Sequence, residues 1–285
     1  MTERIDAHHH LWHYDPVEYG WIDGTMSVLK RDFLPSDLEK EIRAAAIGGT
    51  VAVQARQTLE ETKWLLSQAR SAPFLRGVVG WAPIASATFP EELEGLRQDP
   101  KLKGLRHVIQ DESDPQFMNG AEFNRGIATL TASGLVYDIL IFERQLSAAI
   151  SFVDRHPKQV FVLDHVGKPR IGARVLDPWR SQIAELARRK NVYCKLSGMV
   201  TEANWSSWRV EDLRPYFDVV LGAFGPERMM YGSDWPVCLL AANYGRWCGT
   251  VDTLIEPLSK TEKEMILGGT ATAVYSLGSG KRESH

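Results

Sequence analysis

Short apolar runs alternate with longer helical patterns along the chain and predict eight β/α units. The candidate strands are 4–7, 50–55, 75–81, 104–109, 135–141, 159–163, 192–196 and 229–232. Several of these runs are β-branched and apolar on both faces, as expected of parallel strands that are buried between helices. Their starts lie roughly 24 to 46 residues apart, which is about the length of one strand with its crossover helix and loops.

Helix start signals stand where this alternation requires them. Thr58 with Glu61 has the form of a capping box, and Ser36 or Asp37 can cap the helix that starts near Pro35. Eight such units without a linker or low-complexity break predict an α/β fold of one domain, a (β/α)8 TIM barrel over residues 1–277. We expect residues 278–285 to form a polar, flexible C-terminal tail.

Composition and charge exclude several classes of function. The 285 residues carry 33 Lys and Arg against 36 Asp and Glu, a formal net charge of -3 without a basic cluster, which argues against nucleic acid as a partner. No apolar run approaches the roughly 18 residues that span a membrane. The first residues contain no apolar segment with a cleavage site, so we do not expect secretion. The three cysteines are an odd number at unrelated spacings and predict reduced thiols. We expect a cytoplasmic enzyme, with a homo-oligomer left open.

Two histidines stand on one face at the end of the first predicted strand. Alternate residues of a strand share a face, so His8 and His10 point one way and His9 points the other. Because reactive groups of a (β/α)8 barrel lie at the carboxyl ends of its strands, this pair is a candidate metal site or a clamp for an anionic group. A tag fragment or satisfied surface histidines are the structural alternatives.

A carboxylate and another histidine follow later strands. The eighth predicted strand stops before Asp234, which can take a proton from water and return it to a leaving group, although aspartate is also common in turns and helix caps. The sixth strand is followed by His165, whose alternative is a buried histidine bonded to backbone.

Further strand ends supply candidates for substrate binding. Arg106 and Lys195 could bind a carboxylate or stabilise an oxyanion, and each could equally be a structural ion-pair partner. Gln54 ends the second strand, and Trp81, Tyr137 and Trp235 are aromatic candidates for pocket walls. The sequence contains no GxGxxG, GxxxxGK[ST] or GxSxG motif, so nucleotide cofactors and serine-hydrolase chemistry lack support.

In combination these motifs resemble the amidohydrolase superfamily. The resemblance rests on HxH after strand one, His after strand six and Asp after strand eight, in this order. The segments IDAHHHLW, VAVQAR, DHVGKP, KLSGMVTEA and YGSDWPVCLL are similar to its amidohydrolase-related lactonase branch, which includes 2-pyrone-4,6-dicarboxylate, L-fucono- and L-rhamnono-lactonases. GLRHVIQDE, VYDILIFERQL and SDWPVCLLAA are most similar to the bacterial L-fuconolactonases of that branch.

The resemblance implies a hydrolase that opens a sugar-acid lactone, such as L-fuconolactone in L-fucose degradation, to the free acid. It implies catalytic roles for Asp234, as general base and acid, and for His8, His10 and His165. The superfamily's bridging Lys or Glu on strand four and His on strand five are replaced by Arg106-His107 and Tyr137-Asp138, which argues against a binuclear centre. We therefore expect one Zn²⁺, held by some of His8, His10, His165 and Asp234, or no metal.

The sequence is also compatible with two other kinds of function. Within the same superfamily the chain could be a metal-dependent decarboxylase of an aromatic or muconate-type acid, or a pyrone dicarboxylate lactonase. A non-catalytic sugar-acid binding protein on the same barrel is the alternative outside enzymes, since a fold alone does not fix function.

Overall fold

Eight parallel strands form one sheet in the order β1-β2-β3-β4-β5-β6-β7-β8 in the computed structural model, which describes residues 2–278. The strands are β1 (Ile5–His9), β2 (Gly49–Val53), β3 (Leu75–Gly80), β4 (Leu102–His107), β5 (Val136–Ile139), β6 (Phe161–Leu163), β7 (Val192–Leu196) and β8 (Met229–Tyr231). All eight predicted strands are present, with ends that shift by a few residues. The C-terminal tail expected at 278–285 lies outside the described residues, apart from Gly278.

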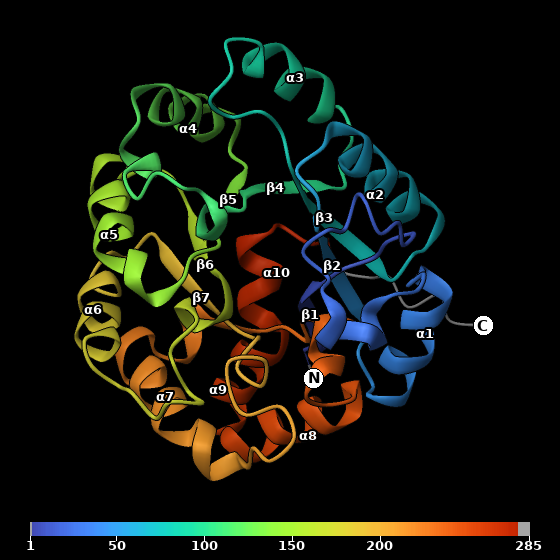
Figure 1. Cartoon of the computed structure of the whole chain (residues 1–285), viewed down its shortest axis with the longest axis vertical. Helices are drawn as coiled ribbons and strands as arrows, with labels where there is room; N and C mark the ends of the chain where they lie inside the picture. The colour runs from blue at the N-terminus through green and yellow to red at the C-terminus, as the bar shows by residue number, and fades with distance from the viewer. Residues whose placement is uncertain (1, 279–285) are drawn as a thin grey trace.

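Most of the helices lie around this sheet and connect its strands, and the last three follow β8 (Figure 1). They are α1 (Pro35–Ala44), α2 (Leu59–Ser71), α3 (Phe89–Leu96), α4 (Ala121–Ser133), α5 (Leu146–Arg155), α6 (Trp179–Leu186), α7 (Val210–Phe224), α8 (Tyr244–Leu254), α9 (Lys260–Glu264) and α10 (Thr270–Val274). A parallel bridge between His9 and Trp235 brings the last strand's end beside the first. The (β/α)8 barrel predicted from the sequence is therefore confirmed.

The predicted helix caps are present with one difference. Thr58 caps α2 by accepting a hydrogen bond from the Glu61 amide, and Asp37 accepts from the Leu34 amide at the start of α1. The Glu61 carboxylate does not complete a capping box, because it accepts instead from the amides of Ala55 and Arg56 after β2. It thus fixes the loop that leaves β2.

The core has two layers, one inside the barrel and one between strands and helices. The interior layer consists of small and branched side chains such as Val51, Val79, Val136 and Val162. Helix α10 lies across the centre of the ring of strands in Figure 1, and its Ala271 packs against this interior layer. Gly268, which precedes α10, lies against the carbonyl of Glu3 just before β1, so α10 covers the amino end of the barrel and leaves the carboxyl end open.

No helix of residues 2–278 is both long and apolar enough to cross a membrane.

Candidate active site

The first and last strands place the histidine pair beside Asp234. The amide of Asp234 donates to the carbonyl of His8 (2.7 Å), and the amide of His10 donates to the carbonyl of Trp235 (2.6 Å). Asp6 reinforces the join, because its Oδ1 accepts from the Ser233 amide (2.8 Å) and its Oδ2 from the Tyr244 hydroxyl (2.9 Å). Backbone pairing therefore fixes which side chains meet here.

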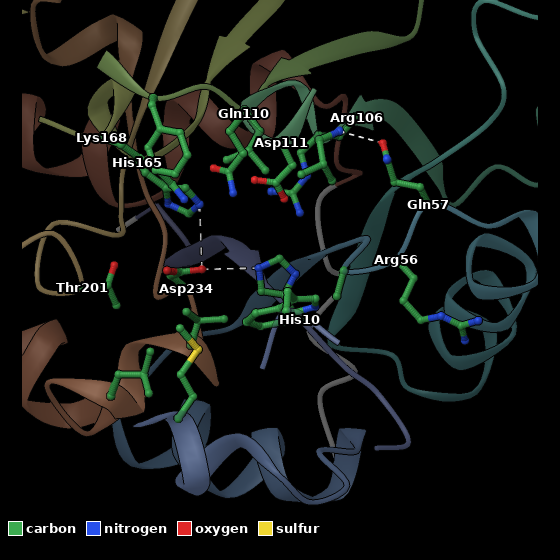
Figure 2. Close-up of a pocket in the computed structure, with 18 of the residues that line it drawn as sticks. His10, Arg56, Gln57, Arg106, Gln110, Asp111, His165, Lys168, Thr201 and Asp234 are labelled. Carbon is green, nitrogen blue, oxygen red and sulfur yellow. Dashed lines mark hydrogen bonds and ion pairs between the residues drawn. The ribbon is translucent and has the colours of Figure 1, made fainter. Parts of the chain in front are cut away.

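Three imidazoles and one carboxylate converge at this point, and Figure 2 shows Asp234 between His10 and His165. The Asp234 Oδ1 atom lies 3.3 Å from His10 Nε2, 3.8 Å from His8 Nε2 and 3.9 Å from His165 Nε2. His8 Nε2 and His10 Nε2 are 3.2 Å apart, whereas His9 turns to the other face and contacts Thr50 Oγ1 at 3.0 Å. The alternation predicted for the three histidines is confirmed.

A strained turn after β6 carries His165. Four consecutive residues have positive φ angles: His165 (53°), Val166 (50°), Gly167 (72°) and Lys168 (48°). A β-branched residue such as Val166 is a real outlier there, and such strain concentrates at functional sites. Gly198 after β7 makes room for the ring, because a Cβ at Gly198 would lie 2.5 Å from His165 Nδ1.

The donor atoms fit one divalent cation. His10 Nδ1 lies 2.9 Å from the Val53 carbonyl, which can only accept, so a neutral His10 presents an unprotonated Nε2. His165 Nδ1 is bonded to the Ser197 hydroxyl at 2.9 Å, and its Nε2 faces Asp234. Imidazole nitrogens and a carboxylate oxygen are the ligands of catalytic zinc sites. His8, His10 and Asp234 also form a group of ligand atoms within 4.8 Å of one another.

Burial and charge set the protonation states of Asp234 and His165, which face each other. Burial alone would raise the pKa of the Asp234 carboxyl, but the imidazoles of His165 and His10 outweigh it and the net shift is downward. Burial lowers the pKa of His165 to about 4. At neutral pH the site therefore holds an ionised carboxylate beside a neutral imidazole, as acceptance of a proton by Asp234 requires.

Beneath the histidines lies a fully buried charge network. The Lys195 ammonium contacts Asp138 Oδ2, Asp164 Oδ1 (3.0 Å) and His8 Nδ1 (3.1 Å). The Arg106 guanidinium donates to Asp164 Oδ2 at 2.9 Å. Two cations and two carboxylates balance one another, which is how proteins keep buried charges. The two cations beside His8 also disfavour a second metal ion there.

A pocket of about 710 Å³ opens above the cluster at the carboxyl end of the barrel. Its floor includes His10, His165, Asp234 and Arg106. Its acidic and basic side chains nearly balance, and apolar groups complete the wall. The other lining residues are Glu18, Trp21, Met26, Ala55, Arg56, Gln57, Thr58, Val108, Gln110, Asp111, Leu140, Phe142, Lys168, Thr201, Glu202, Trp205, Val237 and Leu240.

The three aromatic residues expected to contact substrate do not line this pocket. Tyr137 is fully buried among aromatic side chains such as Phe123 and Phe152, because it projects from β5 toward the helices. Trp235 packs edge-on against Phe33 at 5.1 Å, and the indole N–H of Trp81 points to His107 Nδ1 at 3.4 Å. The prediction that these three side chains form the pocket walls is therefore wrong.

Only one of the three polar residues expected to bind substrate lines the pocket. Arg106 lines the pocket, whereas Gln54 and Lys195 are fully buried beneath it. The side-chain amide of Gln54 donates to the backbone carbonyl of Arg106 at 3.3 Å, and the backbone carbonyl of Gln54 accepts from the Arg106 guanidinium. Gln54 and Lys195 therefore act on the groups at the pocket floor and do not reach the pocket themselves.

Sequence reasoning missed most of the pocket rim and both buried carboxylates. Gln110, Lys168 and Glu202 follow β4, β6 and β7, so the rule that barrel chemistry sits in the loops after the strands could have found them. Asp138 could have been found from alternation, since it shares its face of β5 with the interior residue Val136.

Comparison with known proteins places these residues in a family. The amidohydrolase family matches residues 5–277. The L-fucono-1,5-lactonase of Burkholderia multivorans is 44% identical over 96% of this chain and 96% of the relative. The L-fucono-1,5-lactonase of Burkholderia ambifaria is 35% identical over 100% of this chain and 99% of the relative.

A solved structure shares the fold closely. The crystal structure of an amidohydrolase from Burkholderia multivorans with bound zinc is 44% identical, with a TM-score of 0.93, over 97% of this chain and 100% of that one. The sequence resemblance to amidohydrolases is thereby confirmed.

Proposed function

The chain belongs to the amidohydrolase family, and we propose that it is a lactonase that hydrolyses L-fucono-1,5-lactone or a similar sugar-acid lactone to the free acid. The observation that carries this proposal is an ionised carboxylate, Asp234, held against two imidazoles at the floor of a pocket. It occurs in a chain that is 44% identical to an L-fucono-1,5-lactonase over nearly its whole length.

Asp234 activates the water in the proposed mechanism. Its ionised carboxylate takes a proton as the water oxygen forms a bond to the lactone carbonyl carbon. The same carboxylic acid then gives this proton to the ring oxygen as the ring C–O bond breaks, which leaves the open-chain hydroxy acid. Such positioned proton transfer contributes typically about 10²- to 10⁴-fold to a rate.

Arg106 stabilises the charge that develops on the carbonyl oxygen. The Arg106 guanidinium lies at the pocket floor, where Asp164 fixes its orientation. A preorganised donor aimed at an oxyanion is typically worth about 3 kcal/mol of transition-state stabilisation.

His8, His10 and Asp234 would hold a single divalent cation, with His165 beside them, and zinc is the ion of the solved relative. When bound, the cation would supply Lewis acidity, which lowers the pKa of water to about 7 and polarises a carbonyl. The Val53 carbonyl orients the His10 imidazole, and the Ser197 hydroxyl orients the imidazole of His165.

The balance of charge in the pocket favours a neutral substrate. Arg56 is paired with Glu18 at 2.5 Å and Arg106 is paired with Asp164, which leaves Lys168 as the lining cation without an ion pair among residues 2–278. A dicarboxylate needs two cations that are free to bind it. The hydroxyl groups of a sugar lactone can instead bond to the rim residues Gln110 and Asp111.

A pH-indicator hydrolysis assay tests the proposal. A panel of L-fucono-, D-arabinono-, L-rhamnono- and L-galactono-lactones should release acid with the wild-type protein and much less with Asp234→Asn. Folded protein that opens no sugar lactone would refute the proposal. Release of carbon dioxide from an aromatic acid would then support a decarboxylase, and opening of a pyrone dicarboxylate would support the other lactonase class.

A further inference from the structure

Lys168 is the pocket cation that no carboxylate neutralises among residues 2–278. Three cationic side chains line the pocket: Arg56, Arg106 and Lys168. Arg56 is bound to Glu18 and Arg106 to Asp164, whereas the Lys168 ammonium forms no ion pair in the described part of the chain. A cation in this state can bind an anionic group of a ligand without first breaking an ion pair of the protein.

The surroundings of Lys168 hold its ammonium at the pocket wall without occupying its donors. Lys168 ends the strained turn after β6 with a φ of 48°, and its ammonium lies 5.1 Å from the centroid of the Phe142 ring, which also lines the pocket. Such a cation–π contact attracts the charge but does not take up an N–H group as an oxygen acceptor does. Glu202 lies near enough for its charge to attract Lys168, yet the two side chains form neither a hydrogen bond nor an ion pair. The N–H groups of the ammonium are therefore available to a ligand.

Lys168 stands beside the groups at which the lactone carbonyl reacts. Its amide donates to the carbonyl of His165 at 2.8 Å, and Figure 2 shows it on the side of the pocket that carries His165, away from Arg106. Burial acts to raise the pKa of the Asp234 carboxyl, and the charge of Lys168 adds to the effect of the imidazoles of His165 and His10 that lower it. The field of Lys168 thus reaches the carboxylate that activates the water.

Ring opening changes the charge of the ligand beside these groups. A sugar lactone is neutral, whereas the hydroxy acid formed from it loses its carboxyl proton to solvent and carries one negative charge at neutral pH. Asp234 is ionised again once it has given its proton to the ring oxygen. Two like charges then face each other, and a nearby cation offsets their repulsion. Lys168 is the lining residue that can supply this cation.

We propose that Lys168 is the carboxylate subsite of the pocket: its ammonium binds the carboxylate that ring opening creates, an interaction that the neutral lactone does not make. One unpaired cation matches one carboxylate, which the sugar acid has and the lactone lacks. The inference rests on the proposed function, because that reaction supplies the carboxylate. It adds that inhibition of the enzyme by its acid product depends on Lys168.

Calorimetric titration of the full chain with L-fuconate and with L-fucitol separates the charge from the rest of the ligand. L-Fucitol is the alditol with the same chain of hydroxyl groups and no carboxylate. We expect Lys168→Met to raise the Kd of L-fuconate by about 10- to 100-fold, the usual effect of losing a hydrogen bond between charged groups. The Kd of L-fucitol should rise by less than about threefold, because methionine keeps the length of the side chain and its contact with Phe142. Lys168→Arg keeps the charge and should still bind L-fuconate.

Lys190→Met is the matched control, because it also removes one positive charge. Lys190 is exposed and precedes β7 at the amino end of the barrel, opposite to the pocket. This variant should bind L-fuconate as the wild type does. Added salt should weaken the binding of L-fuconate to the wild type and to Lys190→Met more than to Lys168→Met, because salt screens the charge that Lys168 contributes. In lactone hydrolysis, the ratio of the product's Ki to KM should rise in Lys168→Met.

The inference fails if Lys168→Met binds L-fuconate as tightly as the wild type, or if the binding of L-fucitol weakens by the same factor. D-Galactarolactone, a lactone that carries a second carboxylate, tests the other source of this charge. If the wild type prefers D-galactarolactone to L-fucono-1,5-lactone and Lys168→Met loses this preference, Lys168 binds a carboxylate of the substrate, and the assignment to the product is overturned. A wild type that opens no sugar lactone but binds L-fuconate through Lys168 would refute the proposed function alone.

Discussion

Gly198→Ala is the substitution whose consequence follows most directly from the geometry of the site. Gly198 has a φ angle of +65°, and an added Cβ would lie 2.5 Å from Nδ1, 2.6 Å from Cγ and 2.7 Å from Cβ of His165. These distances are below any ordinary contact. Because Ser197 and the strained turn hold the His165 ring, the ring or the backbone must shift by nearly 1 Å.

Two contributions to the effect can be separated. The left-handed backbone conformation costs an L-residue about 1–2 kcal/mol of stability, and the steric contact adds about 1–3 kcal/mol. A displacement of about 1 Å in a catalytic group can also cost about 10²-fold in rate. We therefore expect Gly198→Ala to fold with reduced stability and to lose about two orders of magnitude in kcat/KM for the sugar lactone.

Gly134→Ala is the matched control. Gly134 ends α4 with a φ of +76°, but a Cβ there would meet no atom within 4 Å. Urea unfolding and lactone hydrolysis should show that Gly134→Ala loses stability and keeps its activity. If Gly198→Ala loses no more activity than Gly134→Ala, the placement of His165 as a catalytic group is wrong.

Three further predictions concern buried charge and metal. Burial raises the pKa of Glu61 to about 7 from its usual 4.5, so the folded state binds a proton more tightly than the unfolded state does. The free energy of unfolding therefore falls as the pH rises between these two values. In urea unfolding, the free energy of unfolding of Glu61→Gln should rise relative to that of the wild type by up to about 3 kcal/mol between about pH 5 and 8. A difference between the two proteins that does not change with pH would contradict this. Lys195→Met leaves Asp138 and Asp164 without their shared ammonium and should lower the free energy of unfolding by about 3–5 kcal/mol, whereas a loss below about 1 kcal/mol would refute the network. Treatment with a chelator should lower both Tm and turnover, and zinc should restore both. If the chelator changed neither quantity, the proposed cation site would be wrong.

The hydrophobic pattern predicted the fold well because each strand of a closed parallel barrel is a short apolar run between polar helices. Both faces of β2, for example, are buried, so Gly49–Val53 reads as a continuous apolar segment. The pattern does not mark the strand ends, because residues such as Ala55 continue the apolar run after the ladder has ended.

Within the site, period-two alternation placed His8 and His10 correctly and, applied to β5, would have chosen Asp138 over Tyr137. Size and aromatic character favoured Tyr137, but its side chain fills the layer between sheet and helices. Lys195 and Tyr275 could not be joined from sequence, because their contact to Asp138 depends on how α10 enters the barrel.

The most direct test of the central claim is the turnover of L-fucono-1,5-lactone by Asp234→Asn. The change removes the charge that accepts the proton and keeps the shape of the side chain. Asp252→Asn, a surface aspartate paired with Arg4, is the control. We expect Asp234→Asn to fold like the wild type, with a kcat at least about two orders of magnitude lower, and Asp252→Asn to keep its activity. Turnover by Asp234→Asn near the wild-type rate would contradict the account.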